Sequence, residues 1–458
     1  MVDTLIDGDV AGAIPVSPIR QSGYGDWISK QPETLQRWFK STGFDAKPGS
    51  RALVAGADGT LERVLFGIGD APDIWEWASL PVGLASGDYC LDESVSDEQG
   101  SDLALAWALA TYRFDRYREP QLEPPKLAWS DKRDEGAARR TAVSTYLVRD
   151  LINTPANDMG PNNLSDAAEN LANETGAKFS VIIGDDLLEQ NYPAIHAVGR
   201  AHDRAPRLID LAWGDENAPK VTLVGKGVCF DTGGLDLKPA SGMELMKKDM
   251  GGAAHVLGIA RMIMTAGLKV RLRVLIPAVE NSVSANAMRP GDVLATRKGL
   301  SIEIGNTDAE GRVILSDALF EASVETPDII IDFATLTGAA RVALGTDLPA
   351  LFVNDDDLAS DILACGTEMT DPLWRMPLWA GYQSQIRGKI ADITNSTGSR
   401  FGGAITAALF LERFVESGIP WAHVDLIAWN LSARPGRPEG GEAMGMRAMY
   451  EMLKRRYG

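Results

Sequence analysis

Short apolar runs alternate with longer segments of helical periodicity through most of the chain. The clearest strand-like runs are residues 221–224, 270–277, 329–333 and 423–429. The clearest helical patterns are 252–265, 310–323, 405–416 and 443–456. Strands that alternate with helices are typical of α/β domains with a parallel sheet. We therefore predict an α/β domain whose mostly parallel central sheet is flanked by helices.

The first 125 residues follow a different pattern. Residues 52–55 and 63–67 are strand-like and flank the turn Asp58-Gly59, and residues 103–117 have the periodicity of an amphipathic helix. This part of the chain holds none of the dense polar motifs found later. We predict that it forms a small, separate α/β domain.

A charged, proline-containing stretch, 119–134, interrupts the pattern as a domain junction would. A chain of 458 residues also exceeds what one hydrophobic core usually organises. We therefore predict a small N-terminal domain at 1–130 and a larger domain at 131–458. The second domain should begin with a linking helix near 135–152, which ends at Asn153-Thr154-Pro155.

The overall charge and the cysteines exclude several classes of protein. The formal net charge of −18 disfavours nucleic acid as a partner, because the surface field repels polyanions. No apolar run approaches the ~20 residues of a membrane span, and the N-terminus has no export signal. The three cysteines have no CxxC spacing, so neither disulfides nor a thiolate zinc site is indicated. We predict a soluble protein of the cytoplasm.

The first dense polar motif, VGKGVCFDTGGLDLKP, covers residues 224–239 directly after a predicted strand. Loops at the ends of parallel strands form the binding crevice in α/β sheets. The motif lacks both the GxxxxGK[ST] and the GxGxxG pattern, which excludes these phosphate and dinucleotide loops. It leaves an unusual set of charged residues in a glycine-rich setting: Lys226, Asp231, Asp236 and Lys238.

Two later motifs add further carboxylates. Asp249 precedes a predicted helix in MELMKKDMGGAAHV, residues 243–256, where an aspartate often serves only as a helix cap. Asp308 and Glu310 stand two positions apart in NTDAEGR, residues 306–312. That spacing can direct both carboxylates to one cation, or it can cap a helix. Each motif alone leaves both interpretations open.

Together the motifs supply four carboxylates that could bind metal, Asp231, Asp249, Asp308 and Glu310, with Lys238 and Arg312 as spare cations. Carboxylate oxygens suit divalent magnesium, manganese or zinc, and several carboxylates can bridge two ions. The HExxH zinc motif is absent, and we interpret the four scattered histidines as packed or surface residues: His196, His202, His255 and His423. A two-metal centre is the most economical interpretation.

These motifs resemble those of the leucyl aminopeptidases, the cytosol aminopeptidase family of metallopeptidases. The resemblance rests on VGKGVCFDTGG, KKDMGGAA and NTDAEGR in this order, and it extends through ATLTGA (334–339) and GGAITAALFLERF (402–414). Residues 1–125 match no motif, although the family carries a smaller, variable α/β domain there. The resemblance implies hydrolysis of the N-terminal residue from peptides.

The resemblance also implies roles for single residues. Lys226, Asp231, Asp249 and Glu310 would bind one metal ion. The other ion would be bound by Asp231, Glu310 and both the side chain and the backbone carbonyl of Asp308. Lysine must be neutral to be a metal ligand, which nearby dications favour.

The implied mechanism uses a hydroxide that bridges the two metal ions and attacks the scissile carbonyl. Lys238 would stabilise the gem-diolate, and Arg312 would hold a bicarbonate ion that acts as the general base. Five residues would line the subsite for the first side chain: Met246, Asn306, Thr335, Leu336 and Gly338. Such an apolar subsite favours Leu or other apolar residues, with broad preference. Family members assemble as homohexamers, dimers of trimers, which the resemblance extends to this chain.

Two other functions remain as alternatives. A two-metal phosphoryl hydrolase would use the same types of residue. An assay that compares turnover of peptide and phosphoester substrates distinguishes it from a peptidase. Some relatives in the family also bind DNA, although the acidic balance argues against that role here.

Overall fold

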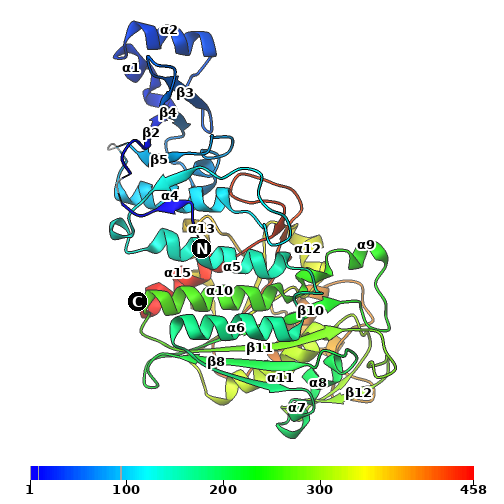
Figure 1. The fold of residues 1–458 in the computed structure, drawn as a ribbon. Helices are drawn as coiled ribbons and strands as arrows, with labels where there is room; N and C mark the ends of the chain where they lie inside the picture. The colour runs from blue at the N-terminus through cyan, green and yellow to red at the C-terminus, as the bar shows by residue number, and fades with distance from the viewer. Residues whose placement is uncertain (1, 9, 93–94) are drawn as a thin grey trace. The chain divides into compact units, whose positions relative to one another are not determined.

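The computed structural model describes residues 2–8, 10–92 and 95–458. The chain divides into two compact units (Figure 1). The smaller unit consists of Met1–Tyr146 together with Ser432–Glu439, and the larger consists of Leu147–Leu431 with Gly440–Gly458. In the described residues, no helix is both long enough and apolar enough to cross a membrane.

The smaller unit is built on a six-stranded sheet with the order β1-β6-β5-β2-β4-β3. Its strands are β1 (Leu5–Ile6), β2 (Ile14–Arg20), β3 (Arg51–Ala55), β4 (Leu61–Ile68), β5 (Asp88–Leu91) and β6 (Lys126–Ala128). Its helices are α1 (Tyr24–Ser29), α2 (Glu33–Thr42), α3 (Ile74–Trp77) and α4 (Asp97–Thr111), and α5 (Ala137–Asn153) continues into the larger unit. Trp77, Trp107 and Trp129 are fully buried in the core of this unit.

The larger unit contains a nine-stranded sheet in which β16-β15-β18-β14-β9-β11-β8-β7 form a continuous order and β10 pairs with β11. Its strands are β7 (Lys178–Ile183), β8 (Arg207–Trp213), β9 (Lys220–Gly225), β10 (Gly227–Asp231), β11 (Arg271–Asn281), β14 (Ile329–Ala334), β15 (Ala350–Val353), β16 (Trp374–Arg375) and β18 (Trp421–Asp425). The central pairs β18-β14, β14-β9 and β9-β11 are parallel. The mostly parallel α/β sheet predicted from the sequence is confirmed.

Helices cover both faces of this sheet. The helices are α6 (Pro161–Thr175), α7 (Asp186–Glu189), α8 (Pro193–Gly199), α9 (Ala240–Met243), α10 (Gly251–Ala266), α11 (Glu310–Val324), α12 (Gly338–Leu344), α13 (Asp356–Glu368), α14 (Gly403–Glu412) and α15 (Met446–Tyr457). Helices α6, α10, α13 and α15 share one apolar core with the sheet, and α8, α11 and α14 share another. Ile329 and Ile331 point into the first core while Ile330 points into the second, as expected of a strand buried on both faces.

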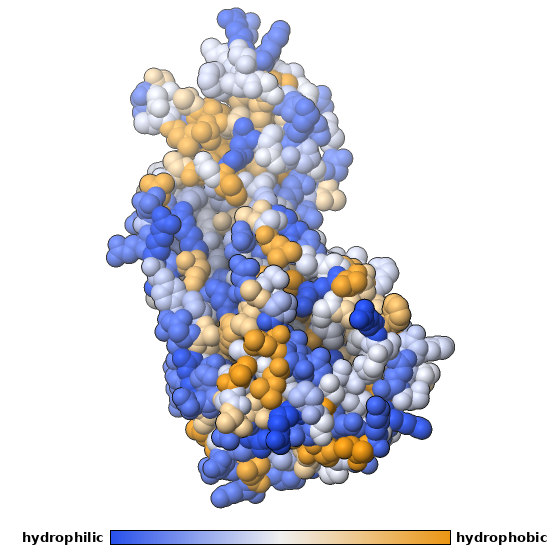
Figure 2. Space-filling model, turned by 90° about the vertical axis from the view of Figure 1, so that its right-hand side faces the viewer, coloured by the Kyte–Doolittle hydropathy of each residue, from blue (hydrophilic) through white to orange (hydrophobic). Residues whose placement is uncertain are grey.

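The remaining short elements lie in the loops of the larger unit. A three-stranded sheet joins β12 (Val293–Ala295), β13 (Ser301–Glu303) and β17 (Ile393–Thr394), and β19 (Trp429–Asn430) pairs with β20 (Gly440–Gly441). The 3₁₀ helices are Gln21–Gly23, Asp131–Arg133, Met246–Met250 and Ala380–Ile386. The face of the molecule that carries α9 and α12 shows separate hydrophobic groups among hydrophilic residues (Figure 2).

Two predicted elements are displaced in the structure. The helix predicted at 103–117 is α4, which starts earlier because Ser96 caps it by accepting a hydrogen bond from Gln99 N–H. The strand predicted at 423–429 ends at Asp425. Beyond it Ala428 has φ 57°, a left-handed conformation that interrupts the extended chain before β19. The division between the compact units falls within α5, and the boundary at residue 130 stays a prediction.

Candidate metal centre

Lys226 lies where the sheet backbone is interrupted, between β9 and β10. Its N–H donates to Phe333 O of β14 at 3.0 Å, but its carbonyl accepts from Ala253 N–H at the start of α10, at 2.9 Å. The backbone therefore leaves the regular ladder at this residue. The strand resumes as β10, which ends at Asp231.

Two glycines allow helices to approach this lysine closely. A Cβ atom on Gly252 would lie 2.1 Å from Phe333 O, so α10 can begin directly over the strands only with glycine there. A Cβ atom on Gly311 would lie 2.4 Å from Lys226 Cε. The glycines of the sequence motifs thus make room for the backbone of α10 and for the Lys226 side chain.

The Lys226 side chain is buried among carboxylates from two different segments. Its ammonium Nζ lies 2.7 Å from Asp249 Oδ2 and 3.0 Å from Glu310 Oε1, and it donates to Thr335 O at 3.1 Å. Burial acts to lower the pKa of Lys226, but Asp249 and Glu310 outweigh it and raise the pKa above its ordinary value. In the absence of another cation, this lysine is therefore charged.

Lys238 forms a second cation–carboxylate group beside the first. Its Nζ lies 2.8 Å from Asp231 Oδ2 and also forms an ion pair with Asp308. Asp231 is held from its other side, because Oδ1 accepts from Asn281 Nδ2 and from Gly233 N–H, both at 2.8 Å. The loop therefore fixes the Asp231 carboxylate against the end of β11.

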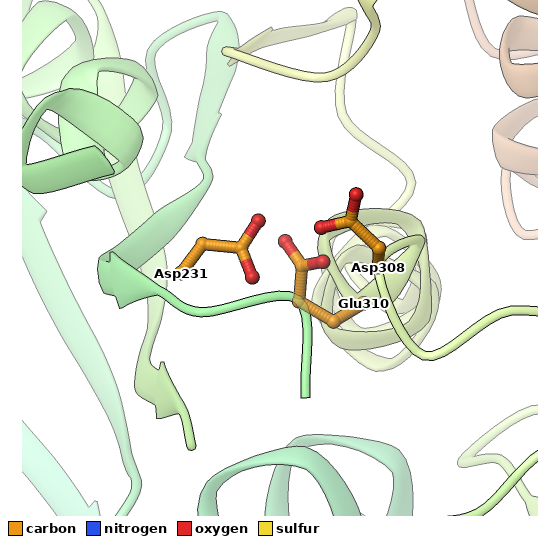
Figure 3. Close-up of side chains that lie close together, drawn as sticks. All are labelled: Asp231, Asp308 and Glu310. Carbon is orange, nitrogen blue, oxygen red and sulfur yellow. The ribbon is translucent and has the colours of Figure 1, made fainter. Parts of the chain in front are cut away.

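Asp231, Asp308 and Glu310 converge from the end of β10 and the start of α11 (Figure 3). One oxygen atom of each carboxylate lies within 4.8 Å of the others, a spacing that could hold a metal ion. In the described structure neither oxygen of Glu310, which is 1% exposed, accepts a hydrogen bond, although the Lys226 ammonium lies 3.0 Å from Oε1 as an ion-pair partner. Lys226 is shared with Asp249, so these buried carboxylates are left with too little positive charge, and the residues present fit divalent metal ions.

Burial first, and then the crowding of negative charge, raises the pKa values of two of these carboxyl groups. Burial, followed by the charge of Asp231, raises the pKa of Glu310 to about 7. Burial and Asp231 also raise the pKa of Asp308 to about 6. The four carboxylates outnumber the three ammonium groups that pair with them, Lys226, Lys238 and Lys248, so the centre has an excess of negative charge that cations would neutralise.

The helix-capping interpretation of Asp249 and Asp308 is not realised. The N-cap positions of α10 and α11 are Met250 and Ala309, and neither provides a side-chain cap. Asp249 Oδ1 instead accepts from Thr335 Oγ1 at 2.8 Å, and Asp308 pairs with Lys238. Both side chains face the carboxylate cluster rather than a helix end.

Arg312 is the third residue of α11, in the same turn as Glu310. Its Nη1 donates to Asn395 O at 2.8 Å, while its buried Nε has no hydrogen-bond partner in the described structure. Burial lowers the pKa of Arg312 to about 10, so the guanidinium remains charged near neutral pH. A cation with a free, buried donor is suited to bind a small anion.

The five residues expected at the side-chain subsite lie on three segments. Met246 is buried in the 3₁₀ helix that carries Asp249, and Asn306 begins the NTDAEGR loop, where its Oδ1 accepts from Asp308 N–H at 2.8 Å. Thr335 and Leu336 follow β14, and Gly338 is the first residue of α12. The Thr335 hydroxyl is directed to Asp249, so its part in any subsite is through its backbone and methyl group.

Sequence reasoning missed several residues that position the cluster. Asn281 fixes Asp231 and also donates to Thr307 O at 3.1 Å. Asn395 clamps the NTDAEGR loop, because its Oδ1 accepts from Gly305 N–H and its Nδ2 donates to Asn306 O. The only sequence signal for Asn281 is a polar residue at the end of a long apolar run, and Asn395 has none.

Comparison with known proteins identifies both parts of the chain. The catalytic domain of the cytosol aminopeptidase family matches residues 146–450, and the N-terminal domain of M17 aminopeptidases matches residues 14–129. A probable cytosol aminopeptidase of Chlorobium limicola is 39% identical over 456 residues, covering 90% of each chain. Peptidase B of Pectobacterium carotovorum is 40% identical over 370 residues, covering 78% of this chain and 83% of that protein.

Solved structures agree with the sequence relatives. The crystal structure of cytosol aminopeptidase from Coxiella burnetii superposes with a TM-score of 0.96 at 49% identity and covers all of both chains. The bottromycin maturation enzyme BotP in complex with Mn superposes with a TM-score of 0.87 at 35% identity, over 97% of this chain and 100% of that one. With its carboxylate cluster and these matches along both domains, the chain belongs to the cytosol aminopeptidase family, the M17 metallopeptidases, and is an aminopeptidase.

Proposed function

We propose that this enzyme removes the N-terminal residue of peptides, preferring Leu or other apolar residues, with two divalent ions bound in the carboxylate cluster. The observation that carries the proposal is the convergence of Asp231, Asp308 and Glu310, in which Glu310 is buried without a hydrogen-bond donor. Zinc, manganese or magnesium would suit these oxygen ligands. The manganese complex of BotP supports manganese as one candidate.

The residues around the cluster divide into two ligand sets in this proposal. Lys226, Asp231, Asp249 and Glu310 would hold one ion, and Asp231, Asp308 and Glu310 the other. Asp231 and Glu310 are then shared, which agrees with their place between the two lysine-centred groups. When bound, the ions would supply an activated water and polarise the scissile carbonyl.

Lys238 is proposed to stabilise the gem-diolate. Its ammonium is partly exposed at 14% of the side chain, while the Lys226 side chain is 4% exposed. Burial acts to lower the pKa of Lys238, but Asp231 outweighs it and raises the pKa, so the group stays charged. A fixed cation beside the reacting carbonyl stabilises negative charge that is larger in the transition state.

Arg312 is proposed to hold bicarbonate as the general base. The unpartnered Nε and the single bond from Nη1 to Asn395 O leave donors for a small anion. The neighbouring carboxylates already form ion pairs with Lys226 and Lys238. In this proposal the proton of the attacking water is therefore accepted by an external base.

Three further properties are proposed from the family resemblance. The chain would assemble as a homohexamer, a dimer of trimers. It would act in the cytoplasm on peptides, with no role for nucleic acid. The N-terminal domain would serve assembly or access rather than chemistry.

The experiment that tests the proposal is a metal-dependence profile on a panel of aminoacyl amides. We expect no turnover after complete chelation, and recovery as two equivalents of zinc, manganese or magnesium are added back. Bicarbonate should raise the rate of the metal-loaded enzyme. Full turnover with metal content confirmed near zero would overturn the proposal, as would phosphoester turnover without peptide turnover.

A further inference from the structure

A cavity of about 580 Å³ lies in the larger unit, apart from the carboxylate cluster. Its walls come from three segments: the start of α7, the end of α8 with the turn that leads to β8, and the loop that follows β11 (Figure 1). A cavity of this size can hold a small organic molecule. Its charged and titratable lining residues are Asp185, His196, Arg200, His202, Asp203 and Arg289.

The cavity and the metal centre lie on different sides of β11. The strand β10, which ends at Asp231, pairs with one edge of β11, whereas β8 pairs with the other edge. The lining of the cavity includes Pro206, which directly precedes β8, and Gly184, which directly follows β7. A ligand in the cavity is therefore separated from Asp231 by β11.

Most charged groups in the wall already have a partner within the chain. Three pairs account for them: His196 with Asp185 at 3.0 Å, His202 with Glu280 at 3.1 Å, and Arg289 with Asp292 at 3.1 Å.

Arg200 and Asp203 are the exceptions. Among the described residues neither side chain forms an ion pair, with the other or with a third residue. Arg200 Nε donates to Asn286 O at 2.9 Å, and the exposed Asp203 carboxylate accepts no hydrogen bond in the described structure. The cavity thus presents one cation and one anion that have no ion-pair partner.

We propose that this cavity binds a free α-amino acid as a zwitterion, with the carboxylate on Arg200 and the ammonium group on Asp203. A simple anion would leave Asp203 without a partner, and a simple cation would leave Arg200 without one. The two residues are three positions apart in one short connection. Their spacing suits a ligand whose two charges are attached to the same carbon, whereas each further residue of a peptide separates its terminal charges by up to ~3.5 Å more.

The site would give the enzyme a place to bind its own product. Free amino acids are released in the reaction described under the proposed function, on which this part of the inference rests. The apolar part of the wall consists of small residues: Ala205, Pro206, Ala285 and Ala287. The charges of the ligand, rather than its side chain, should therefore determine binding.

The test counts the leucine bound per chain in equilibrium dialysis of the metal-loaded enzyme and of Arg200→Met. We expect the variant to bind one leucine fewer per chain than the native enzyme. The reason is that loss of one charge-assisted hydrogen bond should weaken the cavity site by ~10- to 100-fold. Asp203→Asn should lose the same leucine. Turnover of Leu amide should remain unchanged in both variants, because neither residue lies in the metal centre.

Two analogues that the enzyme cannot hydrolyse test the zwitterion itself. 3-Methylbutylamine keeps the leucine side chain and its positive charge, and 4-methylpentanoate keeps the side chain and the negative charge. Each should displace the leucine that Arg200→Met loses at least ~10-fold more weakly than unlabelled leucine does. Equal displacement by either analogue would show a site for a single charge and would overturn the proposal.

Matched variants control for net charge. Arg37→Met replaces an exposed arginine of α2, and Asp357→Asn replaces an exposed aspartate of α13. Both should bind as much leucine as the native enzyme, and loss of a leucine in either would overturn the assignment to the cavity. If Arg200→Met does not fold, Asp203→Asn provides the count, and Arg200→Lys should retain the leucine.

The outcomes separate this inference from the proposed function. Equal numbers of bound leucines in the native enzyme, Arg200→Met and Asp203→Asn overturn the cavity site and leave the aminopeptidase proposal standing. Absence of Leu amide turnover in the native enzyme contradicts the proposed function. The difference of one leucine between native enzyme and variant supports the cavity site in either case, because it does not depend on how many leucines the metal centre binds.

Discussion

At the scale of single residues, two lysines occupy places among carboxylates where cations are needed. Lys226 pairs with Asp249 and Glu310, and Lys238 pairs with Asp231 and Asp308. The two lysines differ in exposure, because only Lys238 is open to an incoming group. A role in charge balance and a role in catalysis therefore predict different effects of replacing Lys238 on metal content and rate.

Replacement of Lys238 by alanine should lower kcat by ~10²- to 10³-fold while two metal ions per chain are retained. The reason is that a charge stabiliser of the transition state is lost, whereas the carboxylate ligands remain. Rate and metal stoichiometry should be measured on the same preparation. Loss of metal in step with activity would show that Lys238 only balances charge.

Replacement of Glu310 by alanine should remove both ions, because this buried carboxylate lies between Lys226 and the other two acids of the cluster. Asp249→Ala should weaken only one ion, since Asp249 contacts Lys226 on one side of the cluster. Metal content after dialysis distinguishes the two variants. Two tightly held ions in Glu310→Ala would rule out bridging.

His255 should make the protein less stable in mild acid. Its Nε2 accepts from Met444 N–H at 2.9 Å, which leaves Nδ1 to donate to Gly251 O at 2.6 Å, so the neutral ring satisfies both partners. Burial lowers the pKa of His255 to about 4, below the ordinary value of 6.5. The folded state thus binds fewer protons than the unfolded state between these values, and stability is lost as pH falls from 6.5 toward 4.

The expected contribution of His255 is a loss of about 2 kcal/mol of unfolding free energy at pH 5. Urea unfolding of the native chain and of His255→Gln at pH 7.5 and pH 5 measures it. The stability advantage of the native chain over the variant should shrink at the lower pH. An advantage that is equal at both pH values would contradict the assignment.

At the scale of elements, the start of α10 determines how the site is assembled. Ala253 N–H binds the Lys226 carbonyl, and Gly251 and Gly252 pack directly against neighbouring segments. This contact turns Lys226 out of the ladder and brings Asp249 beside it. The small residues of the motif are therefore required by packing as well as by chemistry.

Gly252→Ala should lower the free energy of unfolding by about 1 to 3 kcal/mol, because the added methyl group would meet the backbone carbonyl of Phe333. Gly398→Ala is a matched control, since no atom lies within 4 Å of its added Cβ and its φ is not left-handed. The control should change stability by less than ~0.5 kcal/mol. Equal effects of the two substitutions in denaturant unfolding would contradict this packing argument.

At the scale of the whole molecule, all residues of the carboxylate cluster belong to the larger unit. The smaller unit contains no group of three metal-ligating side chains among its described residues. It does recruit Ser432–Glu439 from late in the chain, where Arg437 lies over the Trp75 ring at 3.7 Å from its centroid. Removal of the smaller unit would therefore leave this segment without its packing partner.

A chain that begins at Glu135 should still bind two metal ions and cleave small aminoacyl amides, at a reduced rate and with a lower melting temperature. The chemistry is retained because the ligands are retained, and stability falls because 432–439 loses its contacts. Turnover, metal content and melting should be measured together on material with native circular dichroism. A folded, two-metal form without turnover would assign chemistry to the smaller unit.

The sequence by itself determined the α/β class, the main strands and helices of the larger unit and the family. Long apolar runs indicate strands that are buried on both faces of a sheet. Motifs such as NTDAEGR, in the order found here, identify the family by their resemblance. The limits of α4 and of the strand at Trp421–Asp425 differ from the prediction, because a cap at Ser96 and a left-handed turn at Ala428 act locally. Such features change boundaries without changing the periodic pattern.

Only the tertiary structure decided which residues surround the chemistry. Asn281 and Asn395 are far in sequence from the residues that they bind, and hydrogen bonds across the fold give them their place. It also decided that Asp249 and Asp308 face other charges rather than helix ends. The physical reason is that periodicity records whether a residue is buried, whereas a site depends on which buried charges meet, and that follows from packing between distant segments.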